Sequence, residues 1–281
     1  MGKTLLSIGH GYSAAALSRL LLSEGWTVTG TTRSADKAER LREEGIEPLI
    51  WPGTPLPLDK ATHLLTSVAP EDDGDPVLAR EAEAIRNARH LEWVGYLSTT
   101  GVYGDREGGW VDEDSELKPS TSRGQARVET ECAWQSLDLP IHIFRLAGIY
   151  GPGRGPFAKV RNGTARRIIK NGQVFSRIHV DDIAQVLAAS IATPNPGAIY
   201  NVCDDDPAPP QDVIGFAADL LGLPAPKAAL FEEADMSQMA KSFYAESKRV
   251  RNDRIKDELG IRLLYPTYRE GLSAILAAES P

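Results

Sequence analysis

The first 150 residues alternate short apolar runs with longer segments whose apolar residues recur at helical spacing. Short apolar runs that end in polar or turn residues are typical of buried strands. The predicted strands span residues 4–8, 26–31, 48–51, 63–68, 93–99 and 141–147. Helical spacing predicts helices over 13–23, 35–44 and 76–90. Gly25 and Gly45 end the first two helices, whereas Asp75 and Pro76 begin the third.

Strand and helix in regular alternation predict an α/β fold with a doubly wound parallel sheet, the Rossmann fold, and a ligand across the carboxyl ends of its strands. After Gly151 the rhythm changes to longer helices, and only 177–180 and 198–202 still have the pattern of strands. We expect both to rejoin the sheet. The predicted domains are a dinucleotide-binding Rossmann domain, residues 1–155 with 177–204, and a smaller, mostly helical substrate lobe, residues 156–176 and 205–281.

A glycine-rich turn lies between the first predicted strand and the first predicted helix, within the sequence GHGYSA. Gly9 permits a tight turn, Gly11 lets the backbone approach a pyrophosphate, and Ala14 keeps the helix close to the strand. Tyr12 and Ser13 open the helix, whose N–H groups and positive end favour an anion. The turn predicts a dinucleotide site, with a glycine turn that binds nothing as the alternative.

The end of the second predicted strand indicates which dinucleotide binds. NAD-binding folds of this kind carry an acidic residue there for the ribose 2′-hydroxyl. In this chain Thr32 and Arg33 stand at that position, followed by Ser34. A carboxylate would repel a 2′-phosphate, whereas an arginine can bind it through two hydrogen bonds. We therefore expect NADP rather than NAD, with a merely solvated Arg33 as the alternative.

Composition excludes several other classes of function. The formal net charge of −8 and the absence of a basic stripe argue against nucleic-acid binding. The local cluster of Arg161, Arg166, Arg167 and Lys170 has the spacing of a solvated helix face. No apolar stretch is long enough to cross a bilayer, and no signal peptide is expected. The two distant cysteines predict no metal site and fit a reducing, cytoplasmic compartment.

Four later segments occur in an order that is similar to extended short-chain dehydrogenases/reductases, the group of NAD(P)-dependent epimerases and dehydratases. Residues 97–105 (LSTTGVYGD) resemble the group's "SS…VYG" segment, and residues 144–154 (FRLAGIYGPGR) its "R…YGPG" segment. Residues 177–184 (RIHVDDIA) and 200–202 (YNV) are similar to the two that follow. The resemblance covers roughly residues 3–205, and the remainder matches only loosely.

The resemblance implies a catalytic Ser/Thr, a tyrosine acid/base and a lysine that holds the ribose. Thr99, four residues before Tyr103, takes the hydroxyl position. Arg123 stands where the tyrosine belongs and Arg127 where the lysine belongs. Arginine stays protonated, so Arg123 cannot shuttle a proton, but it can bind a carboxylate or phosphate or stabilise an oxyanion. The chain is therefore identified as an atypical member of the superfamily, in which Arg127 can still hold the ribose.

Two other side chains could supply the proton. Tyr103 is a catalytic candidate because it follows the strand end, with packing in the turn as the alternative. His179 titrates near neutral pH, but the resemblance implies a structural role. The remaining predicted cofactor contacts lie at the carboxyl ends of the fourth, fifth and sixth strands. They are Ser67, Ala69, Ser98, Gly151 and Pro152.

These residues leave two hypotheses open. The first is an NADP-dependent oxidoreductase or epimerase-like enzyme on a small anionic carbonyl or sugar-type substrate. The second is a catalytically silent NADP-binding sensor or regulatory protein, since a sensor needs no acid/base. Helices 76–90 and 123–136, which often pair in dimers of this superfamily, are polar here, so a monomer or a homodimer is expected.

Overall fold

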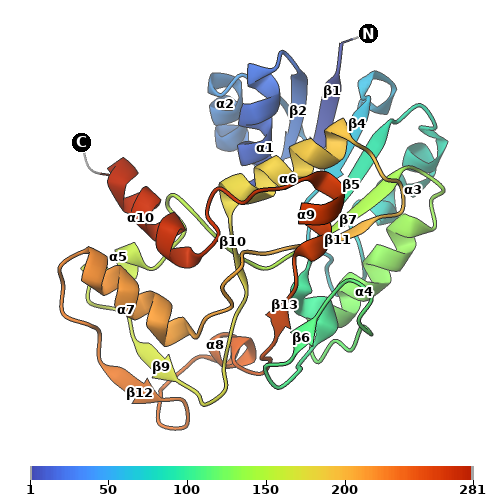
Figure 1. Ribbon diagram of the computed structural model, residues 1–281. Coiled ribbons are helices and arrows are strands. Elements are labelled where there is room, and N and C mark those ends of the chain that lie inside the picture. Colours follow the sequence, from blue (N-terminus) through green and yellow to red (C-terminus); the bar gives the residue numbers. More distant parts are fainter. Residues whose placement is uncertain (1, 280–281) are drawn as a thin grey trace.

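The sheet at the centre of the protein carries seven parallel strands in the order β11-β7-β5-β4-β1-β2-β3. The computed structural model describes residues 2–279 (Figure 1). The strand order is that of a doubly wound Rossmann fold, as the sequence predicts. The strands are β1 (Thr4–Ile8), β2 (Thr27–Thr32), β3 (Glu47–Ile50), β4 (His63–Thr66), β5 (Trp93–Thr99), β7 (Ile141–Leu146) and β11 (Ile199–Val202).

Helices cover both faces of this sheet, and each face has its own apolar core. Leu5 and Leu6 are neighbours on β1, yet they lie in different cores because successive strand residues point to opposite faces. The core around Leu5 is covered by α1 (Tyr12–Ser23), α2 (Ala35–Glu43), α6 (Val180–Ala192) and α9 (Asp253–Leu259). The core around Leu6 is covered by α3 (Leu78–Asn87) and α4 (Ser122–Gln135).

The start of α3 confirms a sequence prediction. Asp75 Oδ1 accepts hydrogen bonds from the backbone N–H of Val77 at 2.7 Å and of Leu78 at 3.1 Å. Its other oxygen, Oδ2, accepts from the indole Nε1 of Trp134 at 2.9 Å. One carboxylate therefore caps α3 and ties it to α4, the second helix on that face.

The C-terminal lobe is small and mostly helical, with a third apolar core that includes Phe157, Val213 and Leu272. It lies beside the carboxyl edge of the sheet (Figure 1). Its elements are α5 (Phe157–Arg161), β9 (Arg167–Ile169), α7 (Pro210–Leu220), β12 (Ala228–Leu230), α8 (Gln238–Phe243) and α10 (Tyr268–Glu279). β12 pairs in parallel with β9, the only two strands of this lobe among the residues described.

Two parts of the topology differ from the prediction. Of the two late strands, β11 joins the sheet beside β7, but β10 (Arg177–His179) pairs with β8 (Gly148–Tyr150) in a separate ribbon. The sheet edge at β7 is occupied by β11, so β10 has no place there. Part of the predicted lobe also returns to the larger domain: β13 (Arg249–Val250) pairs with β6 (Trp110–Val111).

Neither a membrane span nor a metal cluster is found in the part of the chain that the structure describes. Within residues 2–279, no helix is long and apolar enough to cross a membrane. The same residues bring together no group of three histidine, cysteine or acidic side chains able to hold a metal ion.

Candidate cofactor and substrate site

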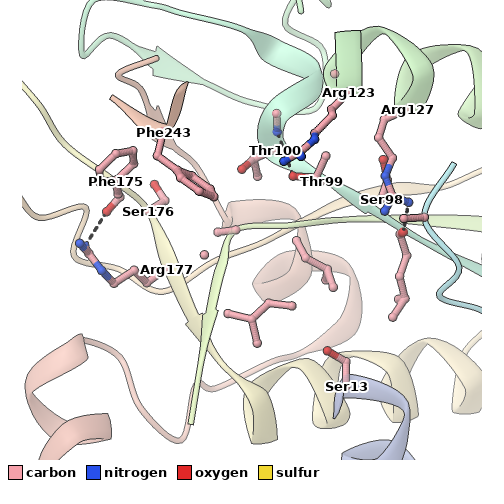
Figure 2. A pocket seen from close by; sticks show the side chains of 18 of the residues that line it. Ser13, Ser98, Thr99, Thr100, Arg123, Arg127, Phe175, Ser176, Arg177 and Phe243 are labelled. Carbon is pink, nitrogen blue, oxygen red and sulfur yellow. Dashed lines mark hydrogen bonds between the residues drawn. The ribbon is translucent and has the colours of Figure 1, made fainter. Parts of the chain in front are cut away.

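A cleft of about 1220 Å³ lies at the carboxyl edge of the sheet, where the Rossmann domain meets the lobe. The ends of β1, β4, β5 and β7 form one side, and the start of α4 borders it. The segments around β10 and between α8 and β13 form the other side (Figure 2). This is the place where ligands bind in open α/β sheets.

The glycine turn opens onto this cleft. Gly9 has a φ of +73°, and a Cβ added there would lie 2.6 Å from Val68 Cγ2, so the tight turn requires glycine. Gly11 has an ordinary φ of −112° and is the N-cap of α1, with no side chain to cap it. An added Cβ at Gly11 would meet only the Gly9 carbonyl oxygen at 3.6 Å. Open space before a helix N-terminus fits a dinucleotide's pyrophosphate.

The first turn of α1 places Tyr12 and Ser13 on the cleft wall, whereas Ala14 is fully buried in the core. The Tyr12 hydroxyl donates a hydrogen bond to the Pro152 carbonyl at 2.9 Å. A Cβ added at Gly151 would lie 2.5 Å from the same hydroxyl. Gly151 and Pro152 therefore support Tyr12 from behind and do not line the cleft themselves.

The residues expected to choose the cofactor lie next to the glycine turn, at the end of β2. Thr32 is buried and its Oγ1 accepts from the Ser34 N–H at 3.2 Å. Arg33 is exposed, and none of the described residues forms a hydrogen bond or an ion pair with its side chain. Lys37, which the sequence reasoning missed, reaches from α2 to donate to the His10 carbonyl. Two cations, Arg33 and Lys37, thus border this side of the turn.

Ser67, Ala69 and Ser98 all line the cleft. The Ser67 hydroxyl donates to the Gly9 carbonyl at 2.5 Å and holds the turn against β4. Thr99 lines the cleft where β5 ends, and its Oγ1 accepts from the Gly101 N–H at 3.2 Å. The Thr99 hydroxyl proton is therefore free to point at a ligand, because this contact uses only an oxygen lone pair.

The two arginines of α4 differ in the hydrogen bonds that their side chains form. Arg127 Nη1 donates to the Tyr96 hydroxyl at 2.7 Å and to the Leu97 carbonyl at 2.9 Å, which fixes its guanidinium at the end of β5. Arg123 is exposed and lines the cleft, and the described residues offer its side chain no partner. Figure 2 shows Arg123 pointing toward Thr99.

Tyr103 does not reach the cleft, which corrects its prediction as a catalytic candidate. Its side chain is fully buried, and its hydroxyl donates to Asn201 Oδ1 at 2.7 Å. The same hydroxyl accepts from Arg145 Nη1 at 2.9 Å. Burial raises the pKa of Tyr103 to about 12. Tyr103 is a core residue that joins β7 to β11.

His179 is a structural residue as well. Its Nδ1 accepts from the Asp181 N–H at 3.2 Å and so caps α6, which begins at Val180. The ring is buried against Tyr265, with ring centroids 4.1 Å apart. Burial lowers the pKa of His179 below its usual value. A buried neutral cap is the role that this geometry supports.

A buried ion pair beneath the cleft escaped the sequence reasoning. Arg145 Nη2 and Glu131 Oε2 are 2.8 Å apart, and both side chains are 3% exposed. Glu131 also accepts from the Ser98 hydroxyl, so the pair sets the position of a cleft residue. One signal was available: Arg145 lies in a mostly apolar strand, and a buried arginine needs a carboxylate. Nothing local identifies Glu131 as its partner.

The lobe's side of the cleft was also missed. Beyond residue 205 the sequence match is loose, and before it no local pattern shows that Phe175 and Arg177 face the cleft. Its lining includes Phe175, Arg177 and Phe243 (Figure 2). Glu246 and Lys248 belong to the same lining. Arg177 Nη1 donates to the carbonyl oxygens of Phe175 and Ala208, both at 2.9 Å. Lys248 donates to the Gly104 carbonyl at 2.8 Å and to Glu246 Oε2 at 2.5 Å.

Several known proteins are similar to this chain over nearly its whole length. No family model matches the chain. A solved structure described as a functionally unknown conserved protein from Silicibacter pomeroyi DSS is 59% identical, covers 99% of this chain and 100% of its own, and superposes with a TM-score of 0.95. Protein YeeZ of Escherichia coli K12 is 28% identical over 94% of this chain and 97% of its own length.

A putative NAD-dependent epimerase/dehydratase from Methylobacillus flagellatus is 27% identical, covers 99% of this chain and 98% of its own, and has a TM-score of 0.72. More distant structures share the fold. A UDP-glucuronic acid 4-epimerase from Bacillus cereus contains NAD, with 18% identity, 96% coverage of both chains and a TM-score of 0.77. The human epimerase family protein SDR39U1 contains NADPH, with 18% identity, coverage of 98% and 99%, and a TM-score of 0.75.

The strand order, the glycine turn at α1 and these neighbours define the class of protein. The chain has the Rossmann fold of NAD(P)-dependent epimerases and dehydratases, the extended short-chain dehydrogenases/reductases, and is similar over nearly its whole length to a putative member of that group. Within that class it belongs to the family of the Silicibacter pomeroyi protein.

Proposed function

We propose that this protein is an NADP-dependent oxidoreductase that acts on a small anionic carbonyl or sugar-type substrate. One observation carries the proposal: the cleft that begins at the glycine turn continues past Thr99 to Arg123 and the lobe. The cleft thus has room for a dinucleotide and for a second ligand beside it. A protein that only sensed NADP would not need this second compartment, so the enzyme is favoured over the sensor.

The proposed preference for NADP rests on two cations beside the glycine turn, Arg33 and Lys37. Arg33 is exposed and has no partner among the described residues, so binding a 2′-phosphate breaks no existing contact. Lys37 adds a second positive charge beside the turn, where it donates to the His10 carbonyl. A charge-assisted hydrogen bond contributes about 1.5–3 kcal/mol, which corresponds to about 10–100-fold in affinity.

Bound NADPH would supply a hydride to the carbonyl carbon, solvent water would supply the proton that the carbonyl oxygen takes up, and the chain's own residues would position the acceptor. The Thr99 hydroxyl can donate to a substrate oxygen at the end of β5. Arg127 is fixed at the same strand end and fits the role of holding the ribose. Arg123 can bind the negative charge of the substrate but cannot release a proton at neutral pH.

Titration of the purified protein with NADPH and with NADH, followed by tryptophan fluorescence, tests the cofactor proposal. We expect tighter binding of NADPH, and we expect Arg33→Ala to weaken NADPH about 10–100-fold while leaving NADH unchanged. Arg40→Ala, on α2 a few residues after Arg33, removes an equal charge at an exposed position and serves as the control. An equal loss for both cofactors in Arg33→Ala contradicts the preference for NADP.

A further inference from the structure

The lobe side of the cleft presents aromatic side chains to whatever binds beside the cofactor. Phe243, at the end of α8, is 62% exposed and lines the cleft. Phe175 lines the same compartment and packs edge-on against Tyr244, with ring centroids 5.9 Å apart. Figure 2 shows the Phe243 ring reaching into the space between Phe175 and the strand end that carries Thr99. An exposed phenylalanine on a cavity wall favours an apolar ligand, because binding would remove it from water.

The charges in this compartment are almost all compensated. Arg177 binds two carbonyl oxygens and lies near Asp204, a buried carboxyl group. Lys248 is 11% exposed in its side chain and is paired with Glu246. Two arginines of the cleft differ, because neither guanidinium has a hydrogen bond or ion pair with any of residues 2–279 that the structure describes. Arg154 lies over the Tyr12 ring at the glycine turn, 5.7 Å from the ring centroid, whereas Arg123 lies next to Thr99.

Next to Thr99, one cation without a partner among the described residues and two aromatic rings limit the substrate. A nucleotide sugar carries two negatively charged phosphates and would need more cations than Arg123 supplies on this side of the cleft. A carboxylate matches one guanidinium through two parallel hydrogen bonds. Aromatic rings interact favourably with one another in offset or edge-to-face arrangements.

We infer that the substrate is a small aromatic monocarboxylate, held with its carboxylate on Arg123 and its ring against Phe243 and Phe175. This inference rests on the proposed function, since the compartment adjoins the cofactor part of the cleft. It narrows the substrate class and excludes nucleotide sugars. The reacting carbonyl then lies on the Thr99 side of the ring.

Isothermal titration calorimetry on the protein saturated with NADP tests this inference by measuring the affinity of three probes. They are trans-cinnamate, its uncharged analogue cinnamamide, and UDP-glucose. We expect cinnamate to bind at least about 10-fold tighter than either of the other two, because only cinnamate has both the ring and the single charge.

Variants separate the two contacts. Arg123→Gln should weaken cinnamate about 10–100-fold and leave cinnamamide unchanged. Phe243→Ala should weaken cinnamate and cinnamamide alike, by about 5-fold or more. Both side chains are exposed, so neither variant disturbs the core. Leu230→Ala is the matched control, since Leu230 is 49% exposed on β12 and lies outside the cleft.

The result that overturns the inference is cinnamate binding that is absent, that is no tighter than UDP-glucose, or that is unaffected by Arg123→Gln. NADPH affinity, measured separately, distinguishes this failure from failure of the proposed function. If NADPH binds and cinnamate fails these criteria, only the substrate class is wrong. If NADPH does not bind, the proposed function itself is wrong.

Discussion

The two glycines of the turn should respond to alanine substitution in opposite ways. Gly11→Ala places a methyl group in the open space at the N-terminus of α1, where the nearest atom is 3.6 Å away and φ is −112°. The backbone conformation suits alanine, so the free energy of unfolding should stay within about 1 kcal/mol of the wild-type value. The same methyl group occupies the place where we expect the pyrophosphate to approach the backbone.

The expected loss of affinity follows from the cost of an added methyl group in a close contact. Overpacking by one methylene costs about 1–3 kcal/mol, which corresponds to about 5–150-fold in the dissociation constant. Gly9→Ala forces alanine to a φ of +73° and places its Cβ 2.6 Å from Val68 Cγ2. That variant should lose about 1–3 kcal/mol of folding stability before any ligand is added.

Urea unfolding and NADPH titration, run on both variants, separate the two effects. We expect Gly11→Ala to unfold like the wild type and to bind NADPH weakly. Gly9→Ala should unfold at lower urea. A Gly11→Ala protein that binds NADPH as tightly as the wild type would refute the placement of the pyrophosphate at this turn.

Two further predictions concern the core. Glu131→Gln leaves Arg145 buried without its carboxylate and should lower the free energy of unfolding, measured in urea, by about 3–5 kcal/mol. Glu116→Gln breaks an exposed pair and should lower it by less than about 1 kcal/mol, so equal losses in the two variants contradict the reasoning. Burial lowers the pKa of His63 from 6.5 to about 4, so its neutral form stabilises the fold fully above pH 6.5 and this stability is lost as pH falls toward 4. The free energy of unfolding of His63→Phe, measured between pH 6.5 and 4, should depend less steeply on pH than that of the wild type. An unchanged slope would contradict the contribution assigned to His63.

The strands of the Rossmann sheet were predictable because each is a short apolar run between turn signals. β5 was predicted with its observed bounds, Trp93–Thr99. β10 was misplaced because its apolar pattern says nothing about which strand it pairs with. The edge beside β7 is occupied by β11, so β10 pairs with β8.

The site was predictable where the chemistry is local. The glycine turn and Thr99 were found because a few consecutive residues define them. Tyr103 was misjudged because its orientation depends on Asn201, which is 98 residues away in the chain. Phe243 was missed because it comes from a segment with a loose sequence match and meets the cleft only through the fold of the lobe. Contacts between distant segments cannot be derived from local patterns.

The central claim is that a dinucleotide binds across the start of α1 and extends to the end of β5. A crystal structure of the complex with NADP tests it most directly. We expect the pyrophosphate on the N–H groups of residues 11–13, the 2′-phosphate on Arg33, and the nicotinamide beside Thr99. A dinucleotide bound away from the glycine turn, or a cleft that stays empty at saturating NADP, would contradict the account.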